Sequence, residues 1–147
     1  MLAEVLRIAL FSLFSVFISA MDIKNGEIPR VAFAIAFPFF FTFNLLISNQ
    51  NWLRESMFGL VLGLITFLLA FIISKGKLGL ADVWYSALIG MVSGLWRWYV
   101  TIALSCFAGI LFIVATKKRK IPFIPFMALG NITAEIFIFF CDFKSFV

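Results

Sequence analysis

Two acidic residues stand at the ends of apolar segments in a chain that carries few charges. Asp22 follows the first apolar segment, and Asp82 closes the small-residue stretch 76–82, which leads into another apolar segment. If helix packing brings these two carboxyl groups together, they will share a proton, because two adjacent carboxylates repel each other. One carboxyl can then take a proton from an attacking water while the other donates to the developing oxyanion. This pattern predicts that Asp22 and Asp82 hydrolyse a peptide bond without a metal or a covalent intermediate.

The residues beside Asp82 leave room for a substrate backbone. Gly79 and Ala81 are small, and an extended peptide that lies against a catalytic carboxylate needs such space. Each acid also has a simpler interpretation. Asp22 alone would be a solvated residue at the end of a span, and Asp82 alone would be an N-terminal cap of the following helix.

The composition is that of an integral membrane protein. The chain has 147 residues, of which 64% are hydrophobic, 13% are charged and 21 are phenylalanine, far from the usage of soluble domains. Because a span needs about 20 apolar residues, this length predicts a single domain, residues 1–147, with about six spans and no separate soluble domain. The net charge of +5 is interpreted as a topology signal and not as a nucleic-acid surface.

Metal and cofactor chemistry is not expected. The sequence has no histidine, and its two cysteines, Cys106 and Cys141, lie within and at the end of apolar runs. Their spacing is not that of a metal site. Both are predicted to be packing residues.

Apolar segments separated by polar turns predict an all-α bundle of transmembrane helices. The turn after Asp22 contains Gly26 and Pro29, and the aromatic run 95–99 predicts a turn at the membrane interface. Two glycine pairs at a spacing of four residues predict close helix packing, Gly59 with Gly63 and Gly90 with Gly94. The predicted spans are Val5–Met21, Val31–Ser48, Met57–Ile73, Val83–Gly94, Val100–Thr116 and Ile121–Cys141.

The fourth predicted span is short. A dozen residues from Val83 to Gly94 make about 18 Å of helix, well below the roughly 30 Å of the hydrocarbon core. We therefore expect Asp82 to lie inside the bundle, since an ionisable group at such depth faces protein or water.

Positive charges are distributed unevenly between the two sides of this bundle. The loops on the side of Asp22 and Asp82 carry eight lysines and arginines, and the other side carries four. Because such an excess marks the cytoplasmic side, both aspartates are predicted to face the cytoplasm, with both termini outside. The eight are Lys24, Arg30, Lys75, Lys77, Lys117, Lys118, Arg119 and Lys120; the four are Arg7, Arg54, Arg97 and Lys144.

Three segments resemble the type IV prepilin peptidase family of membrane aspartic proteases, in the family's order and spacing. The first is Asp22 with Ile28-Pro29, similar to the family's aspartate, basic loop and Ile-Pro-Asn. The second is residues 76–83, GKLGLADV, similar to its Gly-x-Gly-Asp segment. The third is residues 121–130, IPFIPFMALG, similar to its Pro-Phe-Gly-Pro-Phe-x-x-x-Gly stretch.

The resemblance implies an endopeptidase of the prokaryotic cytoplasmic (inner) membrane with Asp22 and Asp82 as its catalytic pair. It would cleave the leader of prepilin-like single-helix membrane proteins at the cytoplasmic boundary, without a cofactor, and would work with pilus or secretion machinery. Larger bacterial members carry a segment with paired cysteines, associated with zinc and N-methylation. Nothing corresponding occurs here, which predicts a minimal peptidase without methyltransferase activity. The implied substrate or loop residues are Ile28, Pro29, Lys77, Gly79 and Ala81, and the implied structural motif is Pro122, Phe123, Pro125, Phe126 and Gly130.

Three positions depart from the family pattern. Arg30 replaces asparagine, Ile124 replaces a glycine, and Ala81 replaces the glycine before the second aspartate. If position 81 needs a positive φ, alanine costs about 1 kcal/mol; if only small size matters, alanine is nearly equivalent. The sequence therefore leaves open a catalytically weak or inactive relative that binds substrates or assists assembly.

Glu135 is a third acid within an apolar segment. It is expected to pair with Asn131 or to line the cavity as an accessory residue. A small proton-coupled transporter using Asp22, Asp82 and Glu135 as a relay is an alternative function, although no internal repeat supports it. A presenilin-type protease shares the Gly-x-Gly-Asp element, but the boundary position of Asp22 argues against it.

Overall fold

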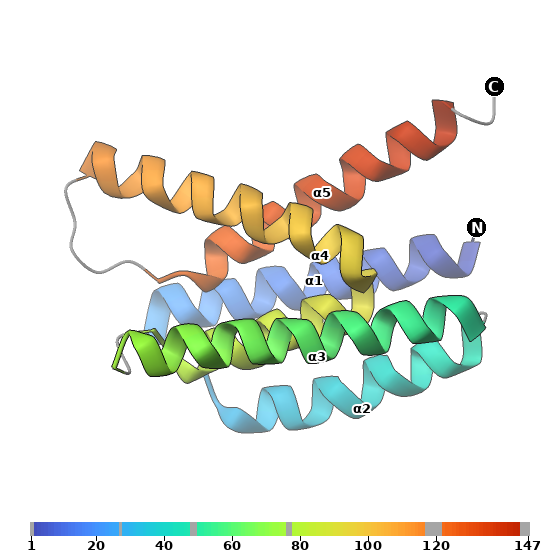
Figure 1. Cartoon of the computed structure of the whole chain (residues 1–147), viewed down its shortest axis with the longest axis horizontal. Helices are drawn as coiled ribbons and strands as arrows, with labels where there is room; N and C mark the ends of the chain where they lie inside the picture. The colour runs from blue at the N-terminus through green and yellow to red at the C-terminus, as the bar shows by residue number, and fades with distance from the viewer. Residues whose placement is uncertain (1, 27, 48–49, 76–77, 117–121, 145–147) are drawn as a thin grey trace.

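The computed structural model describes residues 2–26, 28–47, 50–75, 78–116 and 122–144, and all regular structure in these ranges is α-helical. Figure 1 shows the helices packed lengthwise into a bundle. The predicted all-α fold is confirmed for this part of the chain. The helices are α1 (Leu2–Asn25), α2 (Arg30–Ile47), α3 (Gln50–Ile73), α4 (Leu80–Thr116) and α5 (Ile124–Lys144).

The protein is a membrane protein by the length and composition of its helices. Three stretches are long and apolar enough to cross a bilayer, Glu4–Asn25, Asn51–Ile73 and Leu80–Thr116, and two shorter apolar stretches are Arg30–Leu46 and Ile124–Ile138. Large apolar side chains also lie on the outside of the bundle; Leu46 is 85% exposed and Ile73 is 79% exposed. Such side chains are suited to contact with lipid.

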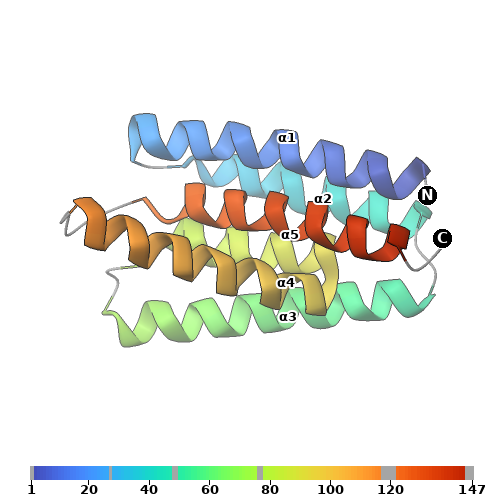
Figure 2. The ribbon, with the colours of Figure 1, turned by 90° about the horizontal axis from the view of Figure 1, so that it is seen from above.

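Helix α4 is broken at Gly94. This residue has φ 80° and ψ 174°, a conformation that is essentially restricted to glycine. The segments before and after it run in opposite directions (Figures 1 and 2). The turn predicted at 95–99 is therefore wrong in position, because these residues are helical and the reversal requires the residue without a side chain.

The first segment of α4 forms the centre of the bundle. Asp82, Val83 and all residues from 85 to 94 are buried. Its contact with α3 is backbone to backbone, because a Cβ added to Gly59 would meet the carbonyl of Gly90, and one added to Gly63 would lie 2.7 Å from the carbonyl oxygen of Ser86. The predicted close packing is confirmed for Gly59, Gly63 and Gly90. Gly94 makes the turn, and its backbone also lies close to Gly59.

Buried hydrogen bonds connect this central segment to its neighbours. Asn44 of α2 donates to the carbonyl of Met91 at 2.9 Å. The indole N–H of Trp98 donates to the Ser86 hydroxyl at 3.0 Å, and that hydroxyl donates to the carbonyl of Gly63 at 3.3 Å. Because lipid offers no hydrogen-bonding partners, polar side chains in a membrane bundle bond to other helices.

The bundle has two ends, which we name by their residues. The aspartate end contains the last turn of α1, which carries Asp22, and the first turn of α4, which carries Asp82. The Gly94 end contains the start of α1 and the reversal of α4 (Figure 1).

Candidate active site

Helix α1 ends one turn after Asp22. Gly26 has φ 67°, and its backbone N–H donates to the carbonyl of Asp22 at 2.9 Å. A glycine with left-handed φ just beyond the last helical residue is a common helix C-terminus. Asp22 is therefore part of the helix and half-buried, and the predicted turn begins at Gly26 and not at Asp22.

Asp82 lies in the first turn of α4, where its carboxylate folds back onto the helix start. Its Oδ2 accepts a hydrogen bond from the backbone N–H of Gly79 at 3.0 Å, while its own N–H donates to the carbonyl of Gly79 at 3.1 Å. A carboxylate in the first turn that bonds the capping residue's N–H satisfies an orphan donor and complements the helix dipole. Asp82 is 7% exposed, so its predicted position inside the bundle is confirmed.

The two carboxyl groups lie near each other at the aspartate end. Asp22 lies close enough to Asp82 for the two carboxyl groups to interact electrostatically. Asp82 is thus a buried acid that receives a backbone hydrogen bond and lies within range of a second acid on another helix. The predicted capping role of Asp82 uses only its Oδ2 atom. The capping role therefore does not exclude a pairing of Asp82 with Asp22.

Ala81 occupies an ordinary helical position. It lies within α4, half-buried against the core. Within the described ranges, positive φ values occur only at Gly26, Lys75 and Gly94. The backbone at position 81 therefore does not require glycine, and alanine is the better helix former.

The loop residues that the resemblance implies differ in their exposure to solvent. Ile28 is half-buried and packs against the core, Pro29 is exposed just before α2, and Gly79 is exposed just before α4. The carbonyl of Pro29 accepts a hydrogen bond from Ala32 at 2.9 Å, which closes the first turn of α2. Lys77 lies outside the described residues.

The Pro-Phe motif at the start of α5 has a packing role. The Phe123 ring stacks on Phe67 of α3 at 6.2 Å between centroids, and Phe126 contacts Phe112 of α4 at 5.3 Å. Gly130 lies directly against Thr101 and Ser105 of α4, where a Cβ would clash. Pro122 is exposed and Pro125 is half-buried.

Glu135 belongs to a second polar cluster, which lies at the Gly94 end. Its Oε2 accepts a 2.7 Å ionic hydrogen bond from Arg97, and the two side chains are 4% and 14% exposed. Asn131, the predicted partner, instead accepts a hydrogen bond from Ser93 at 3.1 Å. The prediction for Glu135 was wrong in its partner because Arg97 was assigned to a loop.

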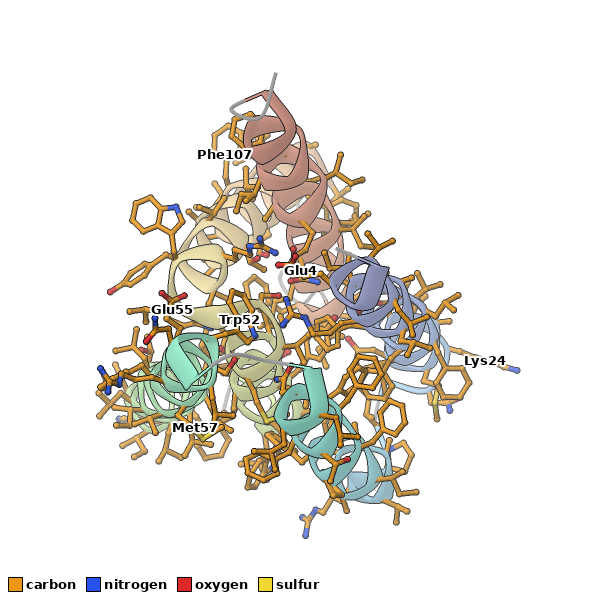
Figure 3. All side chains as sticks on the ribbon, turned by 90° about the vertical axis from the view of Figure 1, so that its right-hand side faces the viewer. Glu4, Lys24, Trp52, Glu55, Met57 and Phe107 are labelled. Atoms are coloured by element: carbon orange, nitrogen blue, oxygen red, sulfur yellow. The ribbon has the colours of Figure 1, made fainter. Side chains whose placement is uncertain are left out.

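Arg7 and Trp52 complete this second cluster and were not identified from the sequence. The guanidinium of Arg7, 3% exposed, lies 4.3 Å from the centre of the Trp52 ring, and that of Arg97 lies 5.6 Å from the same ring. Figure 3, viewed from the Gly94 end, shows Trp52 on the inner side of α3. The available signal was the position of Arg7 inside an apolar segment, since a buried cation in a membrane requires partners.

The fold and site describe an all-helical membrane protein with two acids gathered at one end of the bundle. The sequence matches the type IV leader peptidase family over residues 9–114, and the chain belongs to this family. The match includes Asp22 and Asp82 and ends before the Pro-Phe motif. No curated protein and no solved structure gives a significant match.

Proposed function

We propose that the protein is an aspartic endopeptidase that removes the leader of type IV prepilin-like proteins, with Asp22 and Asp82 as its catalytic pair. The observation that carries the proposal is that the last turn of α1, with Asp22, and the first turn of α4, with the buried Asp82, lie at the same end of the bundle. The two carboxyl groups are within electrostatic range of each other. Family membership supports the peptidase class.

The proposed reaction uses one proton shared between the two carboxyl groups. The ionised carboxyl removes a proton from a water molecule as the water attacks the scissile carbonyl, and the protonated one donates to the oxyanion. Because Gly79 holds Oδ2 of Asp82, the water and the scissile carbonyl approach through Oδ1. The carboxyl that took the proton from water then passes it to the nitrogen of the scissile bond. The tetrahedral intermediate collapses as this C–N bond breaks, and it releases the leader with a carboxyl end and the rest of the substrate with a free amine.

The proposed topology has six membrane-crossing segments, because the break at Gly94 divides α4 into two. The protein lies in the cytoplasmic membrane of a prokaryote. The aspartate end of the bundle faces the cytoplasm, and both chain ends are on the opposite side of the membrane. The burial of Arg7, together with the position of Arg97 in a nearly buried ion pair at 14% exposure, supports this orientation. Once both are removed from the loop charges at the Gly94 end, the positive-charge excess at the aspartate end is larger.

The two alternative functions gain no support from the site. Ala81 gave reason to expect a weak or inactive relative, but its helical backbone does not require glycine. A proton relay through Glu135 is disfavoured because this carboxylate is paired with Arg97, which lies three residues after the break at Gly94, whereas Asp82 lies in the first turn of α4.

The test is cleavage of a prepilin from the same genome, co-expressed with the chain in membranes. Leader removal is followed by mobility shift and by mass spectrometry of the new N-terminus. The native chain is expected to cleave, whereas Asp22→Asn and Asp82→Asn abolish cleavage at normal abundance. Glu4→Gln is the matched control, because Glu4 is a 49% exposed acid at the Gly94 end, and it is expected to leave cleavage unchanged.

Two results would contradict this function. Cleavage that persists in both asparagine variants would remove the carboxyl pair from the mechanism. An uncleaved prepilin beside a folded, abundant native chain, with pilus assembly intact, would indicate the non-catalytic relative.

A further inference from the structure

Tyr85 is a fully buried tyrosine one helical turn after Asp82. Residues three apart lie on the same side of a helix, so Tyr85 and Asp82 face the same neighbours. Its ring stacks on Phe11 of α1 at 6.3 Å between centroids, and Phe11 meets Phe40 of α2 edge-on at 5.2 Å. Tyr85 therefore joins the helix that carries Asp82 to the helix that carries Asp22.

Ser15 of α1 lies one helical turn after Phe11, on the side of that helix that contacts Tyr85. The buried hydroxyl of Tyr85 makes no hydrogen bond of standard geometry within the described ranges, and Ser15 is a polar side chain close to it. Ser15 donates its own proton to the carbonyl of Phe11 at 2.8 Å, so its oxygen can serve Tyr85 as an acceptor. An unbonded buried hydroxyl is unfavourable, whereas a bond to Ser15 satisfies it.

Both aspartates lie nearer to the aspartate end of the bundle than Tyr85 and Ser15 do. Asp22 follows Ser15 by seven residues, which is two turns and about 10 Å along the same face of α1. Asp82 precedes Tyr85 by three residues, about 4.5 Å along α4. The two helices run in opposite directions (Figure 1), so both aspartates lie on the same side of this contact.

We propose that Tyr85 is a positioning residue, which donates its hydroxyl proton to Ser15 and so fixes Asp22 of α1 against Asp82 of α4. The inference that this positioning serves catalysis rests on the proposed function. The positioning itself does not, because it concerns the distance between two helices. The aromatic stack sets how closely the helices approach, and the hydroxyl pair sets their relative shift along the axis.

The first experiment measures this distance without any use of peptidase activity. Cys106 and Cys141 are replaced by serine, Asp22 and Asp82 are replaced by cysteine, and the full chain in membranes is treated with bifunctional thiol reagents of graded spacer length. Linked peptides are quantified by mass spectrometry. Tyr85→Phe is expected to lower the yield with the shortest effective spacer about 3- to 10-fold, the range of one hydrogen bond. Tyr99→Phe, which changes the other tyrosine of the chain at a 55% exposed position, is expected to leave the yield unchanged.

The second experiment measures cleavage kinetics with the native aspartates. Tyr85→Phe and Ser15→Ala are each expected to lower kcat about 3- to 10-fold with KM within about twofold, and the double variant is expected to lose no more than either single variant. Unchanged cross-linking in Tyr85→Phe, or additive kinetic losses, would overturn the proposal. If no form of the chain cleaves a prepilin, the proposed function fails while the cross-linking result still decides the positioning.

Discussion

The backbone N–H of Gly79 donates to Oδ2 of Asp82 at 3.0 Å, and the N–H of Asp82 donates back to the carbonyl of Gly79 at 3.1 Å. This reciprocal pair fixes the carboxylate against the start of α4. The capping role and the pairing with Asp22 are compatible, because the side chain of Asp82 bonds the helix start through one oxygen and lies within electrostatic range of Asp22.

The first prediction concerns the space beside this pair. A Cβ on Gly79 would lie 3.2 Å from Oδ2 of Asp82, tighter than an ordinary contact, so Gly79→Ala must displace the carboxylate by a few tenths of an ångström. We expect cleavage of a prepilin to fall about 3- to 10-fold, as for the loss of one hydrogen bond, with little change in thermal stability. Gly109→Ala is the matched control, since its Cβ would meet the Phe123 ring at an ordinary 3.6 Å. Equal activity in the two variants would contradict the prediction.

Local sequence signals predicted the elements of the site better than their partners. The short apolar segment after Asp82 correctly indicated a buried acid, and the glycine spacing correctly indicated close packing. The identity of the facing residue, Gly90 opposite Gly59, depends on how far α4 is shifted along α3. That shift is a tertiary property and has no signature within either helix.

The buried arginines could not be separated from loop charges by counting. Arg7 and Arg97 contribute to a charge count like any other cation, yet both lie over the Trp52 ring, and Arg97 is paired with Glu135. The predicted turn at 95–99 lies next to the reversal of α4, but the residues themselves are helical. The reversal itself occurs at Gly94, whose combination of φ 80° and ψ 174° is strongly unfavourable for a residue with a side chain.

The second prediction concerns Ala81, where the family pattern has glycine. Because its backbone is helical, Ala81→Gly is expected to reduce stability by about 0.5–1 kcal/mol and not to increase cleavage. Thermal unfolding in detergent and prepilin cleavage are measured on the same preparation. A several-fold gain in cleavage would show that the position needs glycine's conformational freedom in the working enzyme.

The third prediction separates Glu135 from the catalytic chemistry. Glu135→Gln removes the charge that Arg97 contacts at 2.7 Å in a nearly buried pair, and such a loss costs about 3–5 kcal/mol when the remaining charge stays buried. We expect a marked loss of thermal stability, with cleavage per folded molecule retained. Glu4→Gln is the control, since Glu4 is 49% exposed and 4.0 Å from Arg7; its effect is expected to stay within about 0.5 kcal/mol. Loss of cleavage in a stably folded Glu135→Gln protein would instead support a relay.

The fourth prediction ranks two glycines with positive φ by the loss of stability that a substitution at each would cause. Gly94 has φ 80° and ψ 174°, and a Cβ there would lie 3.4 Å from the Trp52 ring. Gly26 has φ 67°, and a Cβ there would meet nothing within 4 Å. An L-residue tolerates the left-handed helix terminus at a cost of about 1 kcal/mol, whereas the extended region at positive φ costs up to about 3 kcal/mol. Gly94→Ala should therefore lower the unfolding temperature more than Gly26→Ala does, and Gly26→Asn should be the mildest of the three. Equal losses at both glycines would mean that the reversal of α4 does not depend on the backbone of Gly94, and the division of α4 into two crossing segments would lose its physical basis.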